Sequence, residues 1–288
     1  MVESALIYSA IRSCVPARYQ QTVRRALYTL KDFKDIGLPN ILEQCPPDTF
    51  RWVNFELNGE CNYNNCWYCP NSVAQGRRGI MSDKIFQTMV SQLAQVGQSG
   101  FKGTINPNFF GEPTVHKGLL IERVKALREC LPDSTIIIHS NGICLTADLF
   151  RELIKSGTDR FIVTRHPGSF SHSLDTMLAQ LTDEERSVMV DRTLDDIKLL
   201  NTVPHVEIPP ERVSHLERCR LPSEQVTITN SGDVVLCCRN FDADIVCGNI
   251  MNDNITSIWK EEGYRNERNN LRMGVFSQPN CKSCMGKE

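Results

Sequence analysis

The sequence predicts an α/β fold, in which βα units build a parallel sheet that closes partly or fully as a barrel. Three observations lead to this prediction. From residue 50, short runs rich in β-branched and aromatic residues alternate with amphipathic helical patterns. Unusual polar motifs follow these runs, at the carboxyl ends of the expected strands, where such barrels gather their chemistry. After about residue 215 the alternation stops, which predicts a second, smaller module.

Five β-runs, separated by helical patterns, form the expected barrel. The runs are WVNFEL (52–57), GTINPNFFG (103–111), STIIIHSNG (134–142), RFIVTRHPG (160–168) and HVEIP (205–209). Two of the helical patterns place apolar residues at helical spacing, with Ile85, Phe86, Met89, Val90, Leu93 and Val96 in the first and Leu119, Leu120, Val124 and Leu127 in the second.

The parts outside the barrel are expected to be an N-terminal helical extension and a C-terminal module. The predicted boundaries are 1–49 for the amphipathic extension, 50–215 for the barrel and 216–288 for the module. In the module, QVTITNSGDVVLCC (225–238) alternates with period two around Asn-Ser-Gly, which predicts a hairpin. NITSIWKEEGYRNERNNLRMG then predicts a single amphipathic helix, and CKSC follows near the end.

The composition argues against several classes of function. The net charge of −2 provides no strongly basic surface for nucleic acid. No apolar run approaches the roughly 20 residues that a membrane span requires, and Glu3 interrupts any signal-peptide pattern. The odd number of cysteines, 13, without an export signal predicts a cytoplasmic protein whose thiols bind metal and do not form disulfides.

The stretch CNYNNCWYCPNS (61–72) places three cysteines in nine positions. A disulfide would leave one thiol over, and a structural zinc site usually needs a fourth ligand. An iron–sulfur cluster held by three cysteines, with one iron open to another ligand, fits the number of thiols as it stands.

This stretch after the first expected strand, with GEP (111–113) after the second, resembles the radical S-adenosylmethionine (SAM) enzymes. The resemblance implies a 4Fe–4S cluster on Cys61, Cys66 and Cys69, with SAM as a consumed cosubstrate on the fourth iron and a partial (β/α) barrel around them. The usual spacing in the family is C-x3-C-x2-C, and this chain has C-x4-C-x2-C, so its first loop is one residue longer. A degenerate zinc knuckle is the structural alternative.

A second cysteine set lies in the C-terminal module, at Cys219, Cys237, Cys281 and Cys284. Its spacing resembles the twitch module, the shortened form of the SPASM domain in radical SAM enzymes. The resemblance implies one auxiliary 4Fe–4S cluster with four protein ligands, and hence two clusters in the chain. A zinc ribbon is the alternative, because a hairpin and a C-x2-C pair can also hold zinc.

The same resemblance implies where SAM is bound. Tyr68 would lie near adenine, Gly111, Glu112 and Pro113 would receive the SAM ammonium, Ser140 and Asn141 would reach the ribose hydroxyls, and Thr164 and Arg165 would add polar contacts. For each residue, a capped strand end or a satisfied loop residue is the structural alternative. Four further cysteines, Cys14, Cys45, Cys130 and Cys144, are expected to be small buried hydrophobic residues.

Within the family, CWYCPNSV, FFGEP, RFIVTRHPG and GNI (248–250) resemble enzymes that act on aminoglycoside antibiotics and their precursors. The resemblance implies an epimerase that inverts a sugar carbon, of the neomycin C to neomycin B type. The alternative is a dehydrogenase that oxidises an aminocyclitol alcohol to a ketone. A non-catalytic zinc protein is a third possibility, which the strand-end motifs disfavour. A flavodoxin or ferredoxin is the expected electron donor, and neither nucleic acid nor membrane is an expected partner.

An epimerase needs a hydrogen donor, and a thiol is the best side chain for this role because its S–H bond is weaker than the sugar C–H bond. Cys247 is the expected donor, since the related dehydrogenase carries methionine there, and Cys238 is its rival. Neighbouring residues in a strand point to opposite faces, so Cys238 should face away from a cluster held by Cys237. A polycationic substrate also needs carboxylates, for which Glu56, Asp242 and Asp244 are the candidates.

Overall fold

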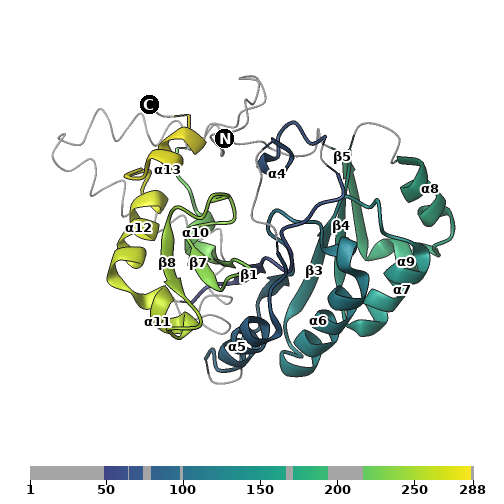
Figure 1. Ribbon diagram of the computed structural model, residues 1–288, viewed down its shortest axis with the longest axis horizontal. Coiled ribbons are helices and arrows are strands. Elements are labelled where there is room, and N and C mark those ends of the chain that lie inside the picture. The colour runs from purple at the N-terminus through teal and green to yellow at the C-terminus, as the bar shows by residue number, and fades with distance from the viewer. Residues whose placement is uncertain are drawn as a thin grey trace, which may run out of the picture. The chain divides into compact units, whose positions relative to one another are not determined.

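One sheet organises the part of the chain that the computed structural model describes, which is residues 49–63, 65–73, 79–97, 100–166, 171–193 and 217–286. Its eight strands follow the order β5-β4-β3-β2-β1-β6-β7-β8. Strands β1 to β6 run parallel to one another, whereas β7 pairs antiparallel with both β6 and β8. Among the described strands, β5 and β8 are the two ends of this order, so the described part of the sheet is an open, partial barrel (Figure 1).

The strands lie close to where the sequence predicts them. Their bounds are β1 Trp52–Phe55, β2 Thr104–Asn106, β3 Thr135–Ser140, β4 Arg160–Arg165, β5 Met189–Thr193, β6 Gln225–Ile228, β7 Asp233–Val235 and β8 Val246–Asn249. Strands β5 and β8 were not predicted. The expected strand at 205–209 and the expected N-terminal helical extension lie outside the described residues.

One or more helices follow each of the strands β1 to β4. Their bounds are α4 Pro70–Val73, α5 Asp83–Ala94, η1 Pro113–His116, α6 Lys117–Cys130, α7 Ala147–Ser156, α8 Ser171–Ala179 and α9 Asp183–Ser187. Helix α5 begins at the N-cap Ser82, whose hydroxyl accepts the amide hydrogen of Ile85. It buries Phe86, Met89, Val90 and Leu93, the face that the sequence predicts.

The C-terminal segment extends the same sheet. Its helices are α10 Leu221–Glu224, α11 Ile255–Lys260, α12 Glu262–Arg272 and α13 Pro279–Cys284. The predicted hairpin forms as β6 and β7, and β6 pairs parallel with β1. The three-part division of the chain stays a prediction, and residues Thr49–Glu288 form one compact unit.

The single helix expected at 254–274 is in fact two helices. Glu261 has φ −54° and ψ 136°, which is extended backbone, and it separates α11 from α12. Its carboxylate accepts the amide hydrogens of Gly263 and Tyr264, so it caps the second helix. The sequence did not predict this break, because apolar residues continue at helical spacing on both sides of it.

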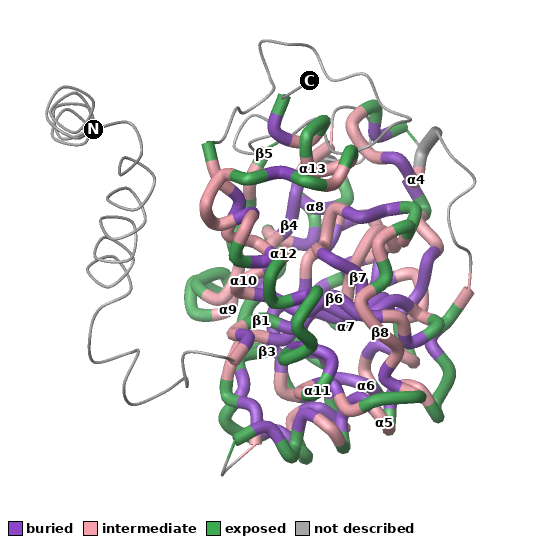
Figure 2. The backbone as a smooth tube through the Cα atoms, turned by 90° about the vertical axis from the view of Figure 1, so that its left-hand side faces the viewer, coloured by how far each residue is buried: buried purple, intermediate pink, exposed green. Residues whose placement is uncertain are grey.

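The core lies between the sheet and its helices, as the buried segments in Figure 2 show. Val53, Phe55, Ile105, Ile136 and Phe161 are buried strand residues of this core. The polar residue Asn54, between Val53 and Phe55, therefore points to the opposite, inner side of the sheet. In the described ranges, no helix has the length and apolar character to cross a membrane.

Candidate functional site

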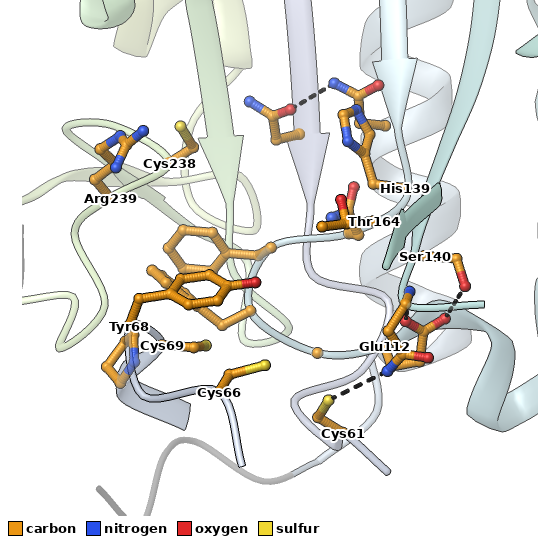
Figure 3. A pocket seen from close by; sticks show the side chains of 18 of the residues that line it. Cys61, Cys66, Tyr68, Cys69, Glu112, His139, Ser140, Thr164, Cys238 and Arg239 are labelled. Atoms are coloured by element: carbon orange, nitrogen blue, oxygen red, sulfur yellow. Dashed lines mark hydrogen bonds between the residues drawn. The ribbon is translucent and has the colours of Figure 1, made fainter. Parts of the chain in front are cut away.

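A cavity of about 440 Å³ opens at the carboxyl ends of the parallel strands. Residues from β1 to β6 and from the loops that follow them line it (Figure 3). Its lining is Trp52, Asn54, Cys61, Cys66, Tyr68, Cys69, Pro70, Asn106, Asn108, Phe109, Phe110, Gly111, Glu112, His139, Ser140, Asn141, Thr164, His166, Arg192, Gln225, Cys238 and Arg239. Below, this space is called the main cavity.

The three cysteines of the first motif all line the main cavity. A turn brings them together, because the amide of Cys69 donates to the carbonyl of Cys66 at 3.0 Å and α4 begins directly afterwards at Pro70. Cys66 is buried, while Cys61 and Cys69 are half-buried. Burial raises the pKa of the Cys66 thiol to about 12 and also raises the pKa of Cys61. Such thiols become thiolates when a metal replaces their protons.

Glu112 ties the ends of three strands together. One carboxylate oxygen accepts hydrogen bonds from the Thr114 amide at 3.1 Å and from the Ser140 hydroxyl at 2.8 Å, and the other accepts the Asn141 amide hydrogen at 2.7 Å. The backbone amide of Glu112 also donates to the carbonyl of Glu60, directly before the cysteine loop. Burial raises the pKa of this carboxyl, against the effect of its hydrogen bonds.

Gly111 allows that backbone contact. A Cβ at this position would lie 2.0 Å from the carbonyl oxygen of Asn58, so no other residue fits without displacing the loop. Pro113 begins the short helix η1 and is buried outside the lining of the main cavity.

Of the remaining residues expected to contact SAM, four line the main cavity and one does not. Tyr68, Ser140, Asn141 and Thr164 are part of the lining. Arg165 points away from it and forms ion pairs with Asp175 at 2.7 Å and Asp191 at 2.6 Å. The reason is strand alternation, because consecutive residues of β4 cannot both face the cavity.

A row of side-chain amides on the strands also lines the main cavity. No sequence motif predicted these residues. Asn106 donates to Asn54 at 2.7 Å, Asn54 donates to Gln225 at 2.8 Å, and Gln225 donates to the Cys238 thiol at 3.1 Å. All three amide residues are buried. A polar residue at an inward position of a buried strand, such as Asn54 in WVNFEL, was the signal available in the sequence.

Four basic residues complete the lining, and none of them was predicted. His139 has a pKa lowered to about 4 by burial and by the neighbouring Arg192, so this imidazole is neutral at pH 7. His166 stacks against Tyr63 and lies 3.6 Å from the Cys66 sulfur, and burial lowers its pKa as well. Among the described residues that line the main cavity, Arg192 and Arg239 are therefore the two that always carry a positive charge.

The four cysteines of the second set meet in a smaller cavity. Cys219, Cys237, Cys281 and Cys284 line it together with Leu271 and Arg239, among other residues. The amide of Cys219 donates to the carbonyl of Leu271 at 2.9 Å, which fixes Cys219 against α12. Burial raises the pKa of Cys281 and Cys284 to about 12. This space is called the auxiliary cavity.

Cys238 and Cys247 lie in different surroundings. Cys238 lines the main cavity, whereas its neighbour Cys237 lines the auxiliary cavity. The two residues lie in the bend and turn after β7 and not in a strand, so strand alternation, on which the prediction relied, is not the reason. Cys247 lies in β8 and lines neither of these cavities. It packs against the core, and burial raises its pKa to about 12, although the charge of Arg268 opposes this rise.

The carboxylates expected to bind a cationic substrate do not line the main cavity. Glu56 is buried and accepts the amide hydrogen of Asn230 at 3.1 Å. Asp242 and Asp244 are exposed, and Asp244 accepts a hydrogen bond from Asn280. Glu112 is the one carboxylate in the described lining.

Two more cysteines differ from their expected burial. Cys130 is exposed, and Cys144 is half-buried and accepts a hydrogen bond from Asn62 at 3.1 Å. Cys14 and Cys45 lie outside the described residues.

Both cysteine sets fit iron–sulfur clusters by donor type and grouping. Three thiols on one cavity wall leave room for a ligand that is not protein, and four thiols around another can enclose a cluster completely. Among the described residues, no three His, Cys, Asp or Glu side chains are arranged to hold a single metal ion.

Comparison with known proteins gives one family model, one relative by sequence and two similar solved structures. A family model for SPASM, described as an iron–sulfur cluster-binding domain, matches residues 219–285. The S-adenosyl-L-methionine-dependent 2-deoxy-scyllo-inosamine dehydrogenase of Niallia circulans is 32% identical over 239 residues, which cover 82% of this chain and 92% of the relative. The crystal structure of BtrN in complex with AdoMet and 2-DOIA is similar with a TM-score of 0.74 and 30% identity, over 82% of this chain and 92% of that one.

A more distant structure, anSMEcpe with bound AdoMet, has a TM-score of 0.55 and 13% identity, and the similarity covers 83% of this chain and 88% of that one. At this identity the similarity concerns the fold alone.

Proposed function

Because the chain belongs to the radical SAM enzymes that carry a SPASM-type module, we propose that it is a dehydrogenase that oxidises an alcohol carbon of an aminocyclitol to a ketone. The observation that carries this proposal is the main cavity, where Cys61, Cys66 and Cys69 share one space with the strand-end polar residues and the amide row. The similarity to the Niallia circulans dehydrogenase, which extends over most of both chains, supports the reaction type.

This proposal corrects the expectation of an epimerase. The curated relative and BtrN match the dehydrogenase alternative, so the prediction that the chain inverts a sugar carbon is wrong. That prediction came from a resemblance of short motifs and was supported by one thiol, Cys247, at a position where the dehydrogenase was expected to have methionine. A single side chain that lines neither cavity carries less weight than similarity over 239 residues.

The cofactors of the proposal are SAM and two 4Fe–4S clusters. Cys61, Cys66 and Cys69 would hold the first, and Cys219, Cys237, Cys281 and Cys284 the second. When bound, these groups supply a 5′-deoxyadenosyl radical that removes a hydrogen atom from the substrate carbon, and an acceptor for the electron that remains. A flavodoxin or ferredoxin is the proposed electron donor.

Glu112 would fix the SAM-binding end of the main cavity. Its hydrogen bonds to Thr114, Ser140 and Asn141 hold the ends of β2 and β3 in one arrangement. The hydroxyl of Ser140 and the amide of Asn141 are thereby preorganised for polar contacts with SAM, and Tyr68 and Thr164 lie in the same lining.

The amide row would bind the hydroxyl groups of the substrate. Amides both donate and accept hydrogen bonds, as ring hydroxyls do, and their mutual hydrogen bonds fix the orientation of Asn54, Asn106 and Gln225. Neutral His139 and the charged Arg192 lie beside them. Because the described lining has two arginines and one carboxylate, it suits a substrate with few ammonium groups better than a polycation.

Anaerobic incubation of the reconstituted protein with SAM, a reductant and 2-deoxy-scyllo-inosamine tests this function. We expect a ketone, detected by mass spectrometry as a product lighter than the substrate by two hydrogen atoms, together with 5′-deoxyadenosine. A matched reaction with Cys61→Ala, Cys66→Ala and Cys69→Ala combined should yield neither product. A wild-type protein that forms 5′-deoxyadenosine with this and related aminocyclitols but no ketone would contradict the proposal.

A further inference from the structure

Residues 237–239 form a wall that the two cavities share. Cys237 lines the auxiliary cavity, Cys238 lines the main cavity, and Arg239 lines both. Figure 3 shows Cys238 and Arg239 together on one side of the main cavity, with Glu112 and Ser140 on the other. The shortest covalent connection between the two spaces is therefore this tripeptide.

Arg239 lies beside the second cysteine set. Its backbone amide donates to the Cys237 sulfur at 3.4 Å, a contact that orients this sulfur within the auxiliary cavity. Arg239 also lines the auxiliary cavity together with Cys219 and Cys284. The residue is thus part of the same lining as all four cysteines of the second set.

Among the described residues that line the auxiliary cavity, Arg239 is the one with a charged side chain. The buried Arg268 stacks on Trp259 at 3.7 Å and lines neither cavity. Among the described residues, Arg239 is the arginine that lines both cavities, so it lies between the main cavity and the second cysteine set.

We propose that Arg239 is a positioning residue that makes the auxiliary cluster an effective electron acceptor for the substrate in the main cavity. The inference rests on the proposed dehydrogenase function. In that oxidation, a hydrogen atom leaves the substrate carbon with the 5′-deoxyadenosyl radical, a proton leaves the adjacent O–H group for solvent, and one electron remains. The oxidant that takes this electron is the auxiliary iron–sulfur cluster, which becomes more negative by one charge. A fixed guanidinium beside its ligands stabilises that reduced form.

The test measures the midpoint potential of the auxiliary cluster in the reconstituted protein by EPR-monitored titration. Combined alanine replacement of Cys61, Cys66 and Cys69 isolates the auxiliary signal. In this background, Arg239→Gln should shift the potential to a more negative value, and Arg239→Lys, which keeps the charge, should stay close to the parent. Arg192→Gln is the matched control, because Arg192 lines the main cavity and not the auxiliary one. The midpoint potential of the auxiliary cluster should not change in this variant. An unchanged potential in Arg239→Gln would overturn the inference.

A second readout uses the protein with both clusters. Arg239→Gln should lower the ratio of ketone to 5′-deoxyadenosine by at least about tenfold, because one charge within roughly 12 Å has this effect at an effective dielectric constant of roughly 20. Arg239→Lys should restore most of the ratio. If Arg239→Gln fails to retain iron, the same comparison is made between Arg239→Lys and Arg239→Met, and equal potentials in these two would again refute the role. Failure of the dehydrogenase proposal would appear differently, as a wild-type protein without ketone product while the potential shift remains.

Discussion

At the residue scale, Glu112 joins binding and stability in one side chain. It is 4% exposed, and its oxygens accept hydrogen bonds from Thr114, Ser140 and Asn141. Each of those donors would be left without its acceptor, or would meet another donor, if the carboxylate were lost. The residue therefore holds the strand ends whether or not it also contacts SAM.

Glu112→Gln is expected to destabilise the protein by about 1–3 kcal/mol, because the glutamine amino group would face a buried hydrogen-bond donor. It should also weaken SAM binding. Denaturant unfolding and equilibrium binding of SAM measure the two effects. Glu129→Gln, at an exposed position of α6, is the control and should leave both unchanged. Equal unfolding curves for Glu112→Gln and the wild type would remove Glu112 from this role.

Individual site residues were predictable where they follow a strand, and less so where they lie within one. Cys61, Glu112 and Asn141 line the main cavity because the carboxyl ends of parallel strands meet at one edge. The choice between Thr164 and Arg165 needed the direction of each side chain, which alternates along the strand. Asn54, Asn106 and Gln225 were missed because single polar residues within β-runs carry no recognisable motif.

At the element scale, hydrophobic periodicity located most strands and helices but not their breaks. Strand β5 escaped prediction because MVDRT has little apolar character, and its residues are exposed or half-buried. The break between α11 and α12 escaped it because the apolar pattern continues past Glu261. A glutamate that caps a helix with its carboxylate gives a weaker signal than serine, threonine or aspartate in the same place.

Glu261→Gln should lower the thermal unfolding temperature at neutral pH, because its carboxylate accepts the amide hydrogens of Gly263 and Tyr264. These hydrogen bonds lower the pKa of Glu261 in the folded protein. Because the pKa of this carboxyl is lower in the folded protein than in the unfolded chain, the carboxylate stabilises the fold at pH values above the unfolded pKa. This stabilisation is lost as the pH falls through the pKa of the folded protein. The difference between wild type and variant should therefore vanish in acid.

Calorimetry across this pH range measures that difference, with Glu262→Gln as the control in the next position. A difference between wild type and Glu261→Gln that persists unchanged in strong acid would show that the carboxylate is not the cap.

At the scale of the whole molecule, the pairing of β1 with β6 determines the arrangement of the two cysteine sets. Val53 pairs with Val226 and Phe55 with Ile228, which joins segments more than 170 residues apart in one sheet. The sequence predicted a barrel and a separate hairpin, and local patterns contain no information on such a distant register. Because of this pairing, the main and auxiliary cavities share the wall at 237–239.

In the proposed reaction, the protein removes hydrogen from a substrate carbon and leaves a ketone. Isotope transfer is the most direct test of this reaction. With an aminocyclitol that carries deuterium on the reacting carbon, one deuterium should appear in each 5′-deoxyadenosine, and the product should be the unlabelled ketone in equal amount. The reaction in deuterium oxide should place no deuterium on that carbon. A product that keeps both hydrogens of the alcohol, has an inverted centre and gains one deuterium at that centre in deuterium oxide would contradict this reaction.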